Sequence, residues 1–177
     1  MNLPTWITVS RLAGVPLLLW WLSGEPTEAD RWWALAVFLL AAGTDWLDGY
    51  LARKLNQVTD LGKFLDPLVD KLLVLAPLLL LVEMGRIPAW SVFVILAREL
   101  TIAGWRVNPT VQGGSIPGAN LWGKAKTVVQ IAAIALLIAP LPVAYQPLGV
   151  VMFWVSVGLT WVSGATYLLP QRSDRSQ

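Results

Sequence analysis

Six long apolar stretches, separated by short polar connections, constrain this chain more than any other feature. Several of them approach the roughly 20 residues that an α-helix needs to cross a lipid bilayer. With 56% apolar and 14% charged residues, the sequence is too apolar for an ordinary soluble domain. The pattern therefore predicts an all-α integral membrane protein with six transmembrane helices, at residues 12–22, 32–52, 64–82, 89–106, 121–139 and 147–169.

The first stretch is shorter than the others, and two interpretations of the residues before it stay open. Residues 3–11 either extend the first spanning helix or form a separate helix that lies on the membrane surface. Leu3, Trp6 and Ile7 give this segment an apolar side. We expect one membrane domain over residues 1–170 and a short polar tail at residues 171–177.

The distribution of Lys and Arg residues predicts the orientation in the membrane. With both termini in the cytosol, only Arg31 and Arg86 fall on the outer side. The remaining basic residues then lie at or near the cytosolic face: Arg11, Arg53, Lys54, Lys63, Lys71, Arg98, Arg106, Lys124, Lys126, Arg172 and Arg175. The net charge of +2 is too small to suggest nucleic-acid binding.

Four aspartates, Asp45, Asp48, Asp66 and Asp70, lie at the cytosolic ends of the second and third predicted helices. A carboxylate costs about 2.5–3.5 kcal/mol at the centre of a membrane helix and less near its end. Four carboxylates so close together imply a compensating positive charge. Since the chain has no cysteine and no histidine, oxygen ligands suit Mg²⁺ or Mn²⁺ better than zinc.

Helical spacing explains how these carboxylates meet. At about 100° per residue, one stripe of the second helix carries Asp45, Asp48, Gly49 and Ala52, with Arg53 at its edge. One face of the third helix carries Gly62, Asp66 and Asp70, which are spaced four apart. Two such rows on adjacent helices can converge on one site, and the glycines leave room for phosphates to approach the backbone.

The complete spacing, D-x-x-D-G-x-x-A-R-x8-G-x3-D-x3-D from Asp45 to Asp70, resembles the signature of the CDP-alcohol phosphotransferase family. An alternative, in which the aspartates merely pair with nearby Lys and Arg, does not require this register. The resemblance implies a CDP-diacylglycerol pocket and two Mg²⁺ or Mn²⁺ ions, with Asp70 also the catalytic base. The metal ligands are then Asp45, Asp48, Asp66 and Asp70, and the pocket is lined by Asp48, Gly49, Ala52, Arg53 and Gly62.

A second cluster consists of the cations Arg98, Arg106, Lys124 and Lys126 on the fourth and fifth helices. Cations within a membrane protein usually face its interior, where they could bind an acceptor phosphate, or they extend to the lipid headgroups. We favour phosphate binding for three of them and leave Lys124 open between the two. Glu99 is expected either to orient a basic side chain or to lie at the interface. Residues 97–99 and 123–130 resemble the branch of the family that makes phosphatidylglycerophosphate.

The resemblance implies an enzyme that transfers a phosphatidyl group from CDP-diacylglycerol to sn-glycerol 3-phosphate, giving phosphatidylglycerophosphate and CMP. It further implies a homodimer in the cytoplasmic membrane of a bacterium, with the active site on the cytosolic face. Alternative acceptors are inositol phosphate and phosphatidylglycerol, the latter in a cardiolipin synthase. A divalent-cation transporter is a more distant alternative, because the acidic residues cluster at one membrane face and the last two spans contain none.

Overall fold

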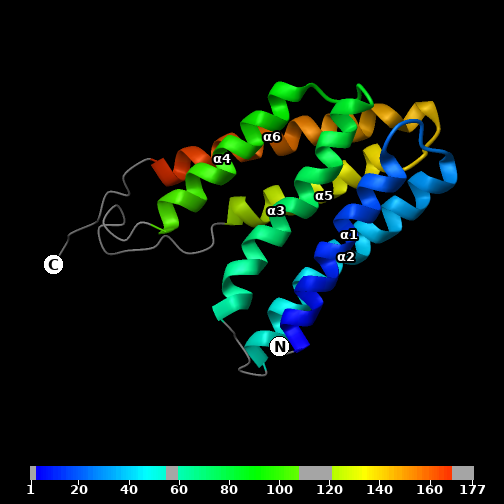
Figure 1. Ribbon diagram of the computed structural model, residues 1–177. Helices are drawn as coiled ribbons and strands as arrows, with labels where there is room; N and C mark the ends of the chain where they lie inside the picture. Colours follow the sequence, from blue (N-terminus) through cyan, green and yellow to red (C-terminus); the bar gives the residue numbers. More distant parts are fainter. Residues whose placement is uncertain (1–2, 55–59, 108–120, 169–177) are drawn as a thin grey trace.

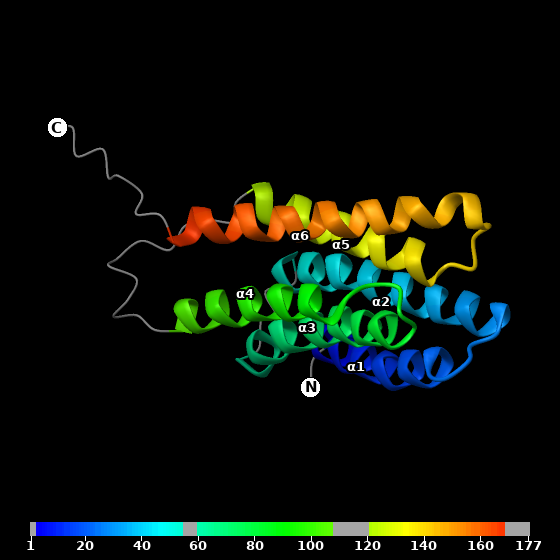
Figure 2. The same ribbon diagram turned by 90° about the horizontal axis from the view of Figure 1, so that it is seen from above.

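The computed structural model is a bundle of α-helices (Figures 1 and 2). It describes the backbone of residues 3–54, 60–107 and 121–168, and the side chains of residues 10–44, 68–104, 123 and 125–164. The elements are α1 (Leu3–Leu22), α2 (Glu28–Lys54), α3 (Asp60–Glu83), α4 (Ala89–Val107), α5 (Leu121–Ile138), a short 3-10 helix η1 (Val143–Tyr145) and α6 (Gln146–Leu168). This part of the chain contains no strand, so the all-α prediction is confirmed.

Each predicted apolar stretch corresponds to one α-helix, and the first helix is longer than its apolar stretch. Residues 3–11 and 12–22 form one unbroken helix, α1, which corresponds to the first of the two interpretations of the N-terminal segment. Among the described residues, one helical segment, residues 143–164, is long and apolar enough to cross a membrane, with a mean hydropathy of 1.5. Shorter apolar helices cover residues 10–22 and 125–138. The count of six spans therefore stays a prediction.

The positions of the connections between helices distinguish the two ends of the bundle. The links α1–α2, α3–α4 and α5–α6 lie together at one end, the connection end (Figure 1). The N-terminus of α1, the last turns of α2, α4 and α6 and the first turns of α3 and α5 point to the opposite end, the open end (Figures 1 and 2). Helices α5 and α6 pack along each other, α1 packs on α2 and α3, and α4 packs on α6.

Among the side chains that the structure describes, all six α-helices contribute to one apolar core. Its largest fully buried side chains are Leu22, Phe38, Leu81, Ile138 and Phe153, one each from α1, α2, α3, α5 and α6. Many large apolar side chains face outward instead: Trp20, Trp32, Trp33, Leu40, Phe93, Val128, Val151 and Trp161. An apolar surface of this extent is typical of a protein that contacts lipid or another protein.

Local hydrogen bonds explain where two of the helices begin and end. Thr27 and Asp30 cap α2 reciprocally: Asp30 Oδ2 accepts from the Thr27 amide at 3.0 Å, and Thr27 Oγ1 accepts from the Asp30 amide at 3.2 Å. Hydrogen bonds from the Thr27 hydroxyl and amide lower the pKa of Asp30. α3 ends at Glu83, and Gly85 just after it has a left-handed conformation (φ 68°). The Arg86 amide donates to the Leu81 carbonyl at 2.9 Å.

Two arginines close the C-terminal end of α5, whose last carbonyls have no partner within the helix. Arg31 donates from Nε to the Ile138 carbonyl at 2.8 Å, and from Nη2 to the carbonyls of Leu137 at 3.2 Å and Ala139 at 2.8 Å. Arg86 Nη1 donates to the same Leu137 carbonyl at 2.7 Å. These are the two arginines that the charge distribution places outside, and here they tie α2 and the α3–α4 turn to α5.

Candidate active site

The backbone places the predicted aspartate rows at the open end. Asp45 and Asp48 lie in the second half of α2, and Asp66 and Asp70 lie in the first half of α3. The two helices contact each other, and these halves lie at the same end of the bundle (Figure 1). The side chains of Asp45, Asp48 and Asp66 lie outside the described residues. The same holds for the predicted nucleotide-pocket residues Gly49, Ala52, Arg53 and Gly62.

Asp70 is the one predicted metal ligand whose side chain the structure describes. Its Oδ1 accepts a hydrogen bond from Arg11 Nη1 of α1 at 3.0 Å. The Arg11 side chain is only 2% exposed, whereas the Asp70 side chain is 44% exposed. The carboxylate of Asp70 is therefore held from the protein side by a buried cation and keeps an accessible side at the open end.

Arg11 was not among the site residues predicted from the sequence. The signal that could have revealed it is a cation within an apolar run, since a buried arginine requires an anionic partner. Which of the aspartates pairs with it depends on how α1 packs against α3, and helical spacing within one segment does not specify that packing.

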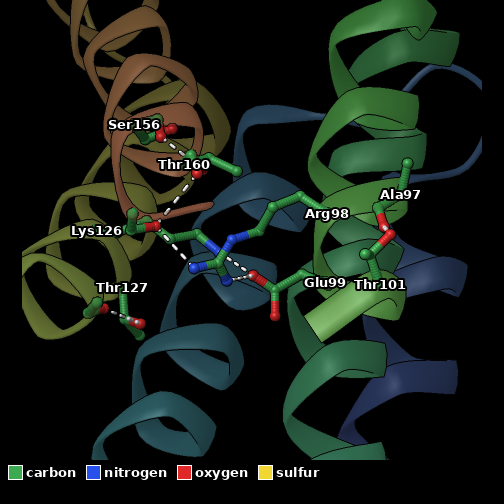
Figure 3. A network of polar contacts seen from close by, with 10 residues as sticks. Ala97, Arg98, Glu99, Thr101, Lys126, Thr127, Ser156 and Thr160 are labelled. Atoms are coloured by element: carbon green, nitrogen blue, oxygen red, sulfur yellow. Dashed lines mark hydrogen bonds and ion pairs between the residues drawn. The ribbon is translucent and has the colours of Figure 1, made fainter. Parts of the chain in front are cut away.

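A second polar cluster joins α4 and α5 (Figure 3). Glu99 Oε1 accepts hydrogen bonds from Arg98 Nη1 at 2.9 Å and from Lys126 Nζ. Arg98 and Lys126 are two of the four cations predicted to bind an acceptor phosphate, and the structure brings them together around a single oxygen atom. The side chains of the other two, Arg106 and Lys124, lie outside the described residues.

Helix α6 holds Arg98 from the other side. Arg98 Nη2 donates to Ser163 Oγ at 2.7 Å, and Ser163 Oγ donates to the Thr160 carbonyl at 3.2 Å. The next residue, Gly164, lies against the aliphatic part of the arginine, because a Cβ built there would be 3.3 Å from Arg98 Cγ. Ser163 and Gly164 were not predicted from the sequence, and only the packing of α4 on α6 reveals their contact with Arg98.

The basic cluster faces the part of α3 that carries Asp70. Helix α3, which carries Asp70 and Lys71, packs against α5, which carries Lys126. One turn along α5, the buried Gln130 has a side-chain nitrogen, Nε2, with no hydrogen-bond partner among the described residues. The cations of α4 and α5 and the aspartate of α3 therefore border one region.

The donor chemistry fits a divalent metal ion. Among the side chains that the structure describes, no group of three His, Cys, Asp or Glu residues forms a site. The predicted ligands are four carboxylates, and hard oxygen donors of this kind suit Mg²⁺ or Mn²⁺. Of these four, the half-exposed Asp70 carboxylate is the one described, and its exposed side leaves oxygen lone pairs accessible.

A family comparison tests these assignments at the level of the whole chain. The sequence model of CDP-alcohol phosphatidyltransferases matches residues 1–162. The chain belongs to the CDP-alcohol phosphatidyltransferase family. The predicted resemblance is therefore confirmed. All predicted site residues of this CDP-alcohol phosphatidyltransferase family member lie within the matched range, and Ser163 and Gly164 follow it directly.

Relatives with curated names cover nearly the full chain. A Bacillus subtilis (strain 168) protein named CDP-diacylglycerol--glycerol-3-phosphate 3-phosphatidyltransferase is 40% identical over 94% of this chain and 93% of its own length. A Pseudomonas fluorescens protein of the same name is 39% identical over 95% of this chain and 89% of its own length. A rice protein named cardiolipin synthase (CMP-forming) is 35% identical over 95% of this chain and 56% of its own length.

Proposed function

We propose that this CDP-alcohol phosphatidyltransferase family member transfers a phosphatidyl group from CDP-diacylglycerol to sn-glycerol 3-phosphate, giving phosphatidylglycerophosphate and CMP. The observation that carries the proposal is the near full-length match to the Bacillus and Pseudomonas proteins, whose names state this reaction. The cluster of the half-buried Arg98 and the buried Lys126 supports it, because such cations suit an acceptor that carries a phosphate.

The proposed membrane arrangement has six spanning helices in a single domain over residues 1–170, with both termini and the site on the cytosolic face. The helices contain 18–27 residues. At a rise of 1.5 Å per residue they are about 27–40 Å long, which matches a hydrocarbon core of about 30 Å. The outward-facing tryptophans and leucines suit contact with lipid. The excess of Lys and Arg at the open end favours the cytosol for that end.

In the proposed mechanism, Asp45 and Asp48 of α2 and Asp66 and Asp70 of α3 would hold two divalent ions, which would supply positive charge against the charge that develops on the pyrophosphate. Asp70 accepts the proton from the attacking glycerol hydroxyl, because a chain without histidine offers carboxylates near the reacting atoms as bases. The hydroxyl oxygen bonds to the phosphorus that carries diacylglycerol, and the bond from that phosphorus to the CMP oxygen breaks. Arg11 keeps the Asp70 carboxylate in place on the α1 side.

The acceptor's phosphate binds, in this proposal, to the cluster of Arg98, Arg106 and Lys126, with Lys124 at its edge. Arg98 and Lys126 already direct N–H groups at one anionic oxygen, which is the geometry that a phosphate oxygen requires. Since α5, which carries Lys126, packs against α3, which carries Asp70, a phosphate bound there would hold the glycerol hydroxyl in the direction of the proposed base.

Phosphatidylglycerol is a second candidate acceptor, favoured by the match to the rice cardiolipin synthase. The experiment that decides is CMP release from CDP-diacylglycerol by the purified protein in detergent–lipid micelles, with each acceptor supplied alone. The panel is glycerol 3-phosphate, inositol phosphate, phosphatidylglycerol and serine. Release with glycerol 3-phosphate is expected. Release with phosphatidylglycerol instead would establish the second candidate, and no release with any acceptor would refute both.

The family resemblance also implies a homodimer. We expect the protein in lipid nanodiscs to have the mass of two chains, as measured by light scattering with the lipid contribution subtracted. The mass of one chain would refute the dimer and leave the proposed reaction unaffected.

A further inference from the structure

One oxygen atom of the protein already lies between the two cations that we assign to the acceptor. Arg98 and Lys126 are pure hydrogen-bond donors, so whatever lies between them must accept. In the structure that acceptor is Glu99 Oε1, which bonds to Arg98 Nη1 at 2.9 Å and to Lys126 Nζ (Figure 3). The carboxylate therefore fills the position that a phosphate oxygen would take.

The two cations are constrained by the helices around them as well as by Glu99. Arg98 also bonds to Ser163 of α6 at 2.7 Å, and its aliphatic part packs against Gly164. Lys126 is buried on α5, with 6% of its side chain exposed. Arg98 keeps its contacts with α6 when the carboxylate moves, and burial of the Lys126 side chain limits the positions open to its ammonium group.

Glu99 is the member of the cluster that has room to move. Its side chain is 25% exposed, compared with 17% for Arg98 and 6% for Lys126. Its second carboxylate oxygen points away from both cations (Figure 3). A rotation toward this accessible side would release the shared position without disturbing the helices.

We propose that Glu99 is a specificity-determining residue that competes with the acceptor's phosphate for the position between Arg98 and Lys126. This inference rests on the proposed function and extends it. Without acceptor, the carboxylate balances the two cations. An acceptor binds by displacing it, so the acceptor must provide a stronger anion than a carboxylate. A phosphate monoester carries about −1.5 to −2 at neutral pH and satisfies this condition.

The same competition excludes weaker acceptors. A neutral alcohol such as glycerol cannot replace the carboxylate, because it would leave two cations without an anion. A phosphodiester, as in phosphatidylglycerol, carries a single charge and has no electrostatic advantage over Glu99. Glu99 thus favours a small phosphomonoester over both, and this preference separates the proposed reaction from cardiolipin synthesis.

The test replaces Glu99 with glutamine, which keeps the shape of the side chain and removes its charge. A hydrogen bond to a charged group is stronger than one between neutral groups by about 1 kcal/mol, which corresponds to a factor of about 5. In Glu99→Gln we expect the apparent KM for glycerol 3-phosphate and the inhibition constant of inorganic phosphate both to fall about 5-fold, with the KM for CDP-diacylglycerol unchanged. Glu83→Gln, an exposed glutamate at the connection end, is the matched control.

A second measurement does not depend on turnover. Inorganic phosphate should raise the unfolding temperature of Glu99→Gln more than that of the wild type, because phosphate supplies the missing anion. Glu99→Asp, whose shorter side chain cannot bridge both cations, should respond in the same direction. If phosphate stabilises neither variant more than the wild type, or if the KM for glycerol 3-phosphate rises, Glu99 positions the cations and does not compete. Failure of both variants to fold in phosphate would contradict the proposal in the same way.

These outcomes are distinguishable from failure of the proposed function. A wild-type protein that releases no CMP with glycerol 3-phosphate refutes the reaction. A wild type that releases CMP with glycerol 3-phosphate, together with variants that bind phosphate no more tightly, refutes only the role of Glu99.

Discussion

The arginine cap on α5 allows a prediction whose size follows directly from the hydrogen bonds. Replacing Arg31 with alanine removes donors from three carbonyls, those of Leu137, Ile138 and Ala139. Two of these keep another partner: Arg86 still donates to Leu137 at 2.7 Å, and the Leu141 amide still donates to Ala139 at 2.8 Å. Among the described residues, the Ile138 carbonyl is then the one of the three with no other side-chain or turn donor.

The expected decrease in the free energy of unfolding is therefore the cost of one unsatisfied polar group, not of three lost hydrogen bonds. Leaving a buried acceptor unpaired costs about 1–3 kcal/mol. For a chain of 150–250 residues, each kcal/mol lowers the unfolding temperature by about 2–4 °C, so a decrease of about 2–12 °C is expected. The double variant Arg31→Ala/Arg86→Ala should lose more than the sum of the single variants, because Leu137 is then also unpaired.

The assay is thermal unfolding in detergent micelles, followed by tryptophan fluorescence, with CMP release measured well below the transition. Arg31 lies at the connection end, far from the proposed site. The variant's kcat/KM at low temperature should therefore stay within about 2-fold of the wild-type value. Strict additivity of the two substitutions would refute the shared carbonyl. A large decrease in kcat/KM in the folded Arg31 variant would show that the cap controls the chemistry at the other end.

Four further outcomes are expected at the open end. Asp70→Asn should lower kcat by about 100-fold or more while leaving CDP-diacylglycerol binding largely intact, measured by turnover and by lipid-nucleotide binding; substantial turnover would exclude Asp70 as the base. Lys126→Ala should raise the KM for glycerol 3-phosphate by about 10–100-fold through loss of a charge-assisted hydrogen bond, and an equal effect on CDP-diacylglycerol would contradict that role. Gly164→Ala should raise the same KM by about 3–10-fold, because its Cβ would lie 3.3 Å from Arg98 Cγ; Gly158→Ala, where no heavy atom lies within 4 Å, should not. Chelation by EDTA should abolish CMP release, and added Mg²⁺ or Mn²⁺ should restore it; activity that persists would refute the metal proposal.

The sequence predicted the helices because their signal is local. Long apolar runs define α2 to α6 within a few residues, and the structure decides only the open question about residues 3–11, which continue into α1. The convergence of Arg98 and Lys126 was also anticipated, since both lie in the parts of α4 and α5 that are nearer the open end. The metal ligands Asp45, Asp48 and Asp66 and the nucleotide pocket stay predictions.

The pairings that the sequence could not provide are those between distant helices. Arg11 meets Asp70 because α1 packs on α3, and Arg98 meets Ser163 because α4 packs on α6. Likewise the charge distribution placed Arg31 and Arg86 at the outer end without indicating that both would bind α5. Each of these pairings depends on the crossing angle and the register of two helices, which the periodicity of one segment does not specify.

The contact of Arg98 with α6 has a consequence for changing what this enzyme accepts. The position of the guanidinium is set by a serine and a glycine on α6, a helix to which we assign no substrate contact. Substitutions in the proposed acceptor pocket on α4 and α5 alone would leave the Arg98 guanidinium in its present position. Variation at residues 163 and 164 offers an independent way to move that charge, by fractions of an ångström, without altering any group that binds substrate.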